Sequence, residues 1–232
     1  MSKTTYKNYM STFRAVCEKV AVNDFYNKPL GGPGLSVEID ETFLSKWKYA
    51  RGRMPKWITL LGITCREQKR SLYWRVDGKY KAIFWPKIKK HVHPETTFIY
   101  TDSAKQYSNV QTIFDDALHG TVNHIKGEFV QLECRENHIN TIESLNRWLK
   151  RSIKSRKDNE HIDSYIQTWV YFKHTYETKT RVDEKIHLFL KDLSRVYPGK
   201  GKEKSPLEWS SYLNEWGFEW VIKVTEKGRV NS

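Results

Sequence analysis

Three strand-like segments follow one another between residues 35 and 76, and they constrain the fold more than any other part of the sequence. Leu35–Phe43 alternates between apolar and polar residues, as a half-buried strand does. Trp57–Cys65 and Ser71–Val76 also have the composition of strands, and the polar turn Arg66–Arg70 joins them. The sequence therefore predicts an antiparallel three-strand meander, which begins after the helix-breaking segment Gly31–Gly34.

Helices and strands alternate after this meander. The first helix is predicted over Lys79–Lys90, where Pro86 either kinks the helix or marks its first turn. The elements predicted next are a strand over Thr97–Thr101, a helix over Ser103–Phe114, a short strand over Thr121–Ile125 and a helix that carries Glu143 in its first turn. This order is the layout of the ribonuclease-H-like fold, an α/β fold in which helices flank a mixed sheet of an antiparallel meander and parallel strands.

Composition divides the chain into three predicted parts. Residues 1–34 hold an amphipathic helix over Tyr6–Val20 and a Gly/Pro linker. Residues 35–196 form the predicted α/β domain, with two further helices over His161–Tyr176 and Arg181–Val196. Residues 197–232 combine a linker with a Trp-rich C-terminal tail, which packs on the core, forms a dimer contact or touches a ligand; packing is the usual role of an aromatic stripe.

The charge balance favours a polyanionic partner. The chain has 40 Lys and Arg residues against 27 Asp and Glu residues, a formal charge of +13, and such an excess is typical of proteins that bind nucleic acid. A merely soluble basic protein is the alternative.

Cysteine usage and hydropathy restrict the location. The three cysteines form no C-x-x-C pair, which disfavours a disulfide framework or a zinc ribbon and indicates a reducing compartment. The N-terminus has no apolar signal core, and the longest apolar run, Trp57–Cys65, is too short to span a bilayer. We expect a protein that is not secreted and does not bind membranes. It should be located in the nucleus of a eukaryote, or in the cytoplasm and nucleoid of a bacterium.

Three acidic residues occupy positions suited to metal chemistry. Asp40 and Asp102 end two predicted strands, and Glu143 lies in the first turn of a predicted helix. Singly, such residues are usually turn or cap residues, or complement the helix dipole. Together they stand where a ribonuclease-H-like sheet gathers its carboxylates, and carboxylates from separate elements can bind two divalent cations, Mg²⁺ or Mn²⁺. Local rivals for the role are Glu38, Glu41 and Glu136, whereas solvation explains Asp115 and Asp116 better.

Two sets of cations accompany these acids. On the predicted Glu143 helix, a cationic stripe stands apart from an apolar stripe of Ile142, Leu145, Leu149 and Ile153. Its members are Arg147, Lys150, Arg151 and Lys154. The second set lies in a loop interleaved with Trp47, Tyr49 and Trp57, and consists of Lys46, Lys48, Arg51, Arg53 and Lys56. Both sets suit contacts with a phosphate backbone, and the loop also suits stacking on unpaired bases; a solvated charged face and an ordinary basic hairpin are the alternatives.

Several motifs together resemble those of a known family. They are VEIDETF with KYARGR after it, YTDSAKQY, TVNH and HINTIESLNRWLKR, with GGPG before the first of them. In this order they resemble the DDE transposases of the Merlin type and the related bacterial insertion-sequence enzymes, over roughly Tyr6 to His174. The resemblance implies a ribonuclease-H-like catalytic domain, cut-and-paste transposition of double-stranded DNA, and a homodimer that brings two element ends together.

The resemblance also implies roles for individual residues. Asp40 in VEIDE, Asp102 in YTD and Glu143 in NTIES match the catalytic triad that binds two Mg²⁺ or Mn²⁺ ions. The matching residues of the VNH and H-x-N-T motifs are expected near the site, where they orient carboxylates or touch DNA; they are Asn123, His124, His138 and Asn140.

The sequence departs from the family at its N-terminus. Family members often carry a zinc ribbon or helix-turn-helix region there that recognises the element ends, and this chain starts too late and has too few cysteines for the zinc version. We therefore expect a truncated copy, a domesticated copy or one half of a split system. The alternatives to a transposase are a catalytically silent DNA-binding protein and a plain metal-dependent nuclease.

Overall fold

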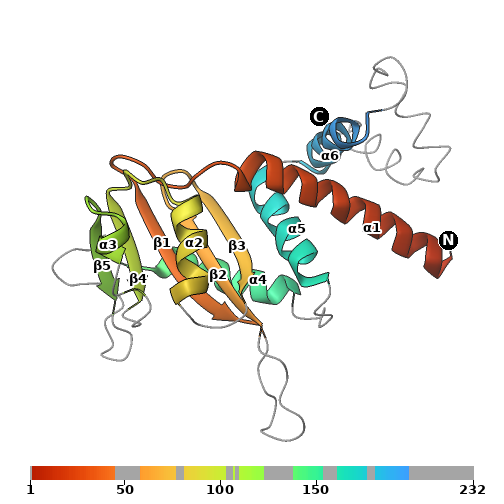
Figure 1. Cartoon of the computed structure of the whole chain (residues 1–232). Coiled ribbons are helices and arrows are strands. Elements are labelled where there is room, and N and C mark those ends of the chain that lie inside the picture. The colour runs from red at the N-terminus through yellow and green to blue at the C-terminus, as the bar shows by residue number, and fades with distance from the viewer. Residues whose placement is uncertain are drawn as a thin grey trace, which may run out of the picture. The chain divides into compact units, whose positions relative to one another are not determined.

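The computed structural model describes residues 2–44, 58–76, 81–102, 107, 110–122, 138–153, 161–176 and 181–198 (Figure 1). The chain forms two compact units, Met1–Thr175 and Tyr176–Ser232. The described part of the second unit contains the helix α6 (Val182–Val196), and the Trp-rich tail lies outside the described residues.

One five-stranded sheet organises the first unit. Its strands lie in the order β3-β2-β1-β4-β5. Their bounds are β1 (Ser36–Phe43), β2 (Thr59–Cys65), β3 (Arg70–Val76), β4 (Phe98–Asp102) and β5 (Leu118–Val122). β1, β2 and β3 pair in antiparallel fashion, whereas β1, β4 and β5 are parallel. The predicted ribonuclease-H-like mixed sheet is thereby confirmed.

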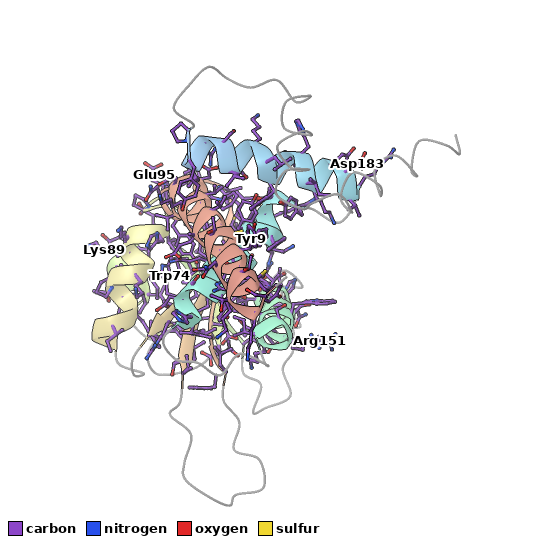
Figure 2. The ribbon with its side chains drawn as sticks, turned by 90° about the vertical axis from the view of Figure 1, so that its right-hand side faces the viewer. Tyr9, Trp74, Lys89, Glu95, Arg151 and Asp183 are labelled. Carbon is purple, nitrogen blue, oxygen red and sulfur yellow. The ribbon has the colours of Figure 1, made fainter. Side chains whose placement is uncertain are left out.

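Helices cover both faces of the sheet. Figure 1 shows α2 (Lys81–His91) in front of the sheet and α4 (Asn140–Ile153) behind it, and the two helices lie on opposite sides in Figure 2. All seven residues of β2 are buried, because this strand has a neighbour at each edge and a helix over each face. On the polar face of β1, Glu38 has no exposed surface and Asp40 is partly buried, because α4 packs against β1.

The N-terminal helix belongs to the same unit as the sheet. α1 (Lys3–Val20) continues into a π-helical segment, η1 (Ala21–Tyr26). α1 packs on α5 (Ile162–Thr175), which in turn packs on β3. The hydroxyl of Tyr26 donates a 2.7 Å hydrogen bond to the carbonyl oxygen of Tyr73 in β3. These contacts attach the N-terminal helix to the β3 edge of the sheet.

Of the two alternatives for Pro86, a kink within the helix or a place in its first turn, the structure excludes the second, because Pro86 lies inside α2. One predicted strand begins later than the observed one. β5 begins at Leu118, three residues before the predicted start, because Leu118 pairs with Phe98 at the start of β4 and donates to the carbonyl oxygen of Thr97. The side chain of Leu118 is 61% exposed, so no buried apolar pattern marks this start. Of the helix predicted over Ser103–Phe114, the structure describes α3 (Val110–Ile113).

None of the helices in the described ranges combines the length and the apolar character that crossing a bilayer requires.

Candidate active site

Asp40 and Asp102 each come one residue after the parallel pairing of β1 with β4 ends. Asp102 is the last residue of β4, whereas β1 continues past Asp40 to Phe43 and Asp40 pairs with Gly62 of β2. β1 and β4 are parallel neighbours, and their last paired residues are Ile39 and Thr101. The next residue on each strand is an aspartate. The carboxyl ends of parallel strands are where open α/β sheets place their ligands, so the pairing brings these two carboxylates to one edge of the sheet, as the sequence predicts.

Glu143 approaches this edge on α4. Ile142, Leu149 and Ile153 are buried, and their helical spacing turns one face of α4 toward β1 and β2. Leu145, predicted to share this face, is only partly buried. Glu143 lies in the first turn of α4, as predicted.

Burial and neighbouring acids raise the pKa of Asp40. Burial is the largest cause of a rise in the pKa of Asp40 from 3.8 to about 7. The negative charges of Asp102 and Glu41 raise it further, the backbone N–H of Glu41 lowers it, and the charge of Glu143 adds a smaller rise. Like charges in a partly buried site disfavour ionisation. The fold therefore gathers Asp40, Asp102 and Glu143 into one region of negative charge.

The donor chemistry of this region fits a divalent cation. Carboxylate oxygens are the ligands that Mg²⁺ and Mn²⁺ prefer, and positive charge would relieve the repulsion that raises the pKa of Asp40. Within the described ranges, however, no three His, Cys, Asp or Glu side chains stand together in a group that could hold a metal ion. The charge and the oxygen ligands of the acids fit a divalent cation. To coordinate one together, the acidic side chains would have to move closer to one another.

Asn146, which was not assigned to the site from the sequence, and Glu38, a rival candidate for the acidic role, both connect α4 to β1. The side-chain amide of Asn146 donates to Oδ2 of Asp40 at 2.7 Å, and Asn146 is buried. Oε2 of Glu38, two residues before Asp40, accepts from the backbone N–H of Ile142 at 2.8 Å. The sequence signal for Asn146 is its place on the apolar face of the helix, one turn after Ile142, where an apolar residue would be usual.

Arg66 neutralises Glu38. Its Nε lies 2.5 Å from Oε1 of Glu38, and its guanidinium carbon lies 4.6 Å from the centre of the Tyr100 ring on β4. The same guanidinium donates to the carbonyl oxygen of His138, which precedes α4. Arg66 thus links β1, β4 and the start of α4. Because Glu38 is paired with Arg66, its role is structural, unlike the metal-binding role predicted for Asp40.

His138 lies beside this ion pair. Its Nδ1 is 3.3 Å from a terminal guanidinium nitrogen of Arg66 and 3.9 Å from Oε1 of Glu38. Burial lowers the pKa of His138, and the charge of Arg66 lowers it further against the opposing charge of Glu38. Asn140, the first residue of α4, is exposed. Asn123 and His124 lie outside the described residues.

Tyr107 contacts the other side of the acidic region. Its hydroxyl donates to Oε2 of Glu41 at 2.8 Å, and the residue is 1% exposed. Burial raises the pKa of Tyr107 well above its ordinary value, and the charge of Glu41 adds to the rise. Tyr107 is therefore a hydrogen-bond donor to the residue next to Asp40.

The cationic stripe of α4 is only partly described. Arg147 and Arg151 are exposed and Lys150 is partly buried; Figure 2 shows Arg151 on the opposite side of the unit from Lys89 of α2. The guanidinium carbon of Arg151 lies 5.4 Å from the ring centre of Trp148, which is 58% exposed. The remaining predicted DNA-binding residues lie outside the described part of the chain: Lys46, Lys48, Arg51, Arg53, Lys56 and Lys154.

The comparisons with known proteins agree with this architecture. The model of the ISXO2-like transposase domain matches residues 29–174, more than half of the chain, and this range contains the sheet, α4 and all of α5 except its last residue. No curated protein sequence matches the chain. The family match confirms the resemblance to insertion-sequence transposases of the DDE type. With its mixed sheet and with Asp40 and Asp102 on the neighbouring parallel strands β1 and β4, the chain belongs to the ISXO2-like transposase family.

Proposed function

We propose that this transposase hydrolyses phosphodiester bonds at the ends of a DNA element and joins the freed 3′-hydroxyl to target DNA. Asp40, Asp102 and Glu143 are the proposed catalytic and metal-binding residues. The observation that supports this proposal most is the parallel pairing of β1 with β4, which brings Asp40 and Asp102 to the same end of two neighbouring strands. The charges of Asp102 and Glu143 both contribute to the rise in the pKa of Asp40, and negative charge gathered in this way attracts cations.

Two Mg²⁺ or Mn²⁺ ions bound by these carboxylates would lower the pKa of the attacking water or 3′-hydroxyl and stabilise the leaving oxygen. The protein's own contribution is to hold the carboxylates on rigid elements. Asp40 lies on a central strand with a paired neighbour at each edge, and Glu143 lies on a helix packed against that strand. Such rigidity keeps the reacting groups in position.

DNA is the proposed substrate of the cationic surface. Arg147, Lys150 and Arg151 share α4 with Glu143, so phosphates contacted by these residues would lie near the acids. Contacts with phosphates position a duplex without reading its sequence. The basic loop Lys46–Lys56 and Lys154 are proposed to extend this surface, and a homodimer is proposed to hold two element ends together.

The test is a cleavage and joining assay on supercoiled and linear duplex DNA with Mn²⁺ or Mg²⁺. The variants are Asp40→Asn, Asp102→Asn and Glu143→Gln, and the matched control is Glu95→Gln, which removes an exposed acid before β4. The expected result is nicking and joining by the wild type and by Glu95→Gln, abolished in the three site variants while binding of DNA persists.

The other outcomes separate the alternative functions. Metal-dependent cleavage without joined product would indicate a plain nuclease with the same site. Salt-sensitive DNA binding without any metal-dependent product, by a folded wild type, would indicate a silent DNA-binding protein. The melting temperature gives a second measurement. Mn²⁺ should raise the melting temperature of the wild type through binding linkage, and the rise should be smaller in Asp102→Asn.

A further inference from the structure

α4 is hydrogen-bonded to β1 at two points. The backbone N–H of Ile142 donates to Glu38, and the side-chain amide of Asn146 donates to Asp40. Ile142 and Asn146 are four residues apart and share one face of the helix. Glu38 and Asp40 are two residues apart and share one face of the strand.

The repeats of the two elements match along this contact. Four residues of an α-helix rise about 6 Å, and two residues of a β-strand rise about 6.6 Å. The pairs Ile142–Glu38 and Asn146–Asp40 therefore place α4 alongside β1 in a defined register. Glu143 lies between the two points on the helix, so a shift of this register would move Glu143 relative to Asp40.

Packing alone does not account for the amide at position 146. Asn146 is 4% exposed, and its Oδ1 has no hydrogen-bond partner within the part of the chain that the structure describes. A buried amide oxygen without a partner is unfavourable, and asparagine is a poor residue for a helix interior. An apolar side chain would suit the buried face of α4 better, and the contact that favours asparagine is the bond to Asp40.

We propose that Asn146 is a positioning residue, whose amide fixes the orientation of the Asp40 carboxylate and sets the register at which α4 presents Glu143. The proposal rests on the function proposed above for Asp40 and Glu143. An amide suits this role because it donates a hydrogen bond at every pH and adds no charge to a group of acids that already repel one another. Groups that orient metal-binding side chains affect cation affinity without touching the cation.

The test compares Asn146→Leu, Asn146→Gln and the control Ser152→Ala in the full chain. Ser152 is an exposed residue of α4 whose hydroxyl bonds to the carbonyl oxygen of Trp148 in the same helix. Two properties are measured: the affinity for Mn²⁺ by calorimetry in the absence of DNA, and amide hydrogen exchange along α4.

Asn146→Leu is expected to lower the affinity for Mn²⁺ by about 10-fold or more and to speed exchange in α4. Ser152→Ala should leave both properties unchanged. Asn146→Gln keeps the amide on a longer side chain and should fall between the wild type and Asn146→Leu. If Asn146→Leu does not fold, the same two measurements on Asn146→Gln decide.

Wild-type affinity and wild-type exchange in Asn146→Leu would overturn the proposal. A wild type that binds no Mn²⁺ would instead contradict the proposed function. Hydrogen exchange would then still decide whether Asn146 sets the register of α4: faster exchange in Asn146→Leu supports that role, and unchanged exchange rejects it.

Discussion

The ring of Tyr73 fills the space that a side chain at Gly62 would need. A Cβ atom on Gly62 would lie 2.6 Å from Cε1 of Tyr73 and 3.0 Å from Cδ1 of Ile142. Gly62 pairs with Asp40 on one side and with Tyr73 on the other. The glycine thus lets a buried ring and the start of α4 pack against the strand next to Asp40.

Replacing Gly62 with alanine should therefore destabilise the fold and displace α4. Neither Tyr73 nor Ile142 is exposed, so neither can move into solvent, and overpacking of this kind costs about 1–3 kcal/mol. Denaturant unfolding of Gly62→Ala measures the loss. In a Tyr73→Ala background the cost of Gly62→Ala should shrink, since the main clash is gone; an equal cost in both backgrounds would show that Tyr73 is not the cause.

Two buried tyrosines should respond differently to loss of the hydroxyl. The Tyr73 hydroxyl has no hydrogen-bond partner within the described ranges, so Tyr73→Phe should leave the free energy of unfolding unchanged or raise it by up to about 1 kcal/mol. Tyr107→Phe removes the donor to Glu41 and should cost about 1–3 kcal/mol. Chemical denaturation of both variants tests the contrast, and equal losses would contradict it.

Removal of Arg66 should be among the most damaging substitutions in the chain. Glu38 has no exposed surface, and Arg66→Met would leave its carboxylate buried without a counter-charge, at a cost of about 3–5 kcal/mol. The control is Arg195→Met in α6, where the partner Asp192 lies 3.7 Å away and the arginine side chain is 50% exposed; such surface pairs contribute about 1 kcal/mol or less. Similar unfolding free energies for the two variants would reject the structural role of Arg66.

The stability of the metal-free protein should depend on pH through Asp40. Its pKa is about 7 in the fold against 3.8 ordinarily, so the folded state retains a proton that the unfolded chain releases. The stability that this residue contributes is fully present below pH 3.8 and is lost as the pH rises to about 7. Asp40→Asn, which is neutral throughout, should therefore gain stability relative to the wild type over this range and keep a constant advantage above it.

Other groups act in the opposite direction and make the paired comparison necessary. Burial lowers the pKa of His91 from 6.5 to about 4, with smaller effects of Lys90 and Lys87 against a Tyr26 backbone hydrogen bond. His91 therefore favours unfolding as the pH falls through this range. Its contribution cancels when Asp40→Asn is compared with the wild type at each pH. A difference between the two proteins that does not change from pH 4 to pH 8 would contradict the raised pKa of Asp40.

The local sequence predicts the order of strands and helices along the chain and the elements that carry the three acids, because alternation and helical spacing are local properties. Contacts between distant segments are not local, and they account for what the sequence did not reveal. Arg66 belongs to a polar turn, and its partners Glu38 and Tyr100 lie far from it in the chain. A glycine within an apolar strand, such as Gly62, indicates that another group approaches the backbone closely. That this group is Tyr73 could be identified only from the strand pairing.

The position of Arg66 in the turn between β2 and β3 has a consequence for heating. The carbonyl of His138, which precedes α4, is attached to the sheet through Arg66, so fraying of this surface turn would loosen the approach to α4 while the strands remain paired and the bond from Ile142 to Glu38 still holds the helix. Local opening of this kind requires less free energy than global unfolding. Thermal inactivation should therefore set in at a lower temperature than the collapse of the sheet, and a stiffer turn would extend the working range of the enzyme without any change to its acids.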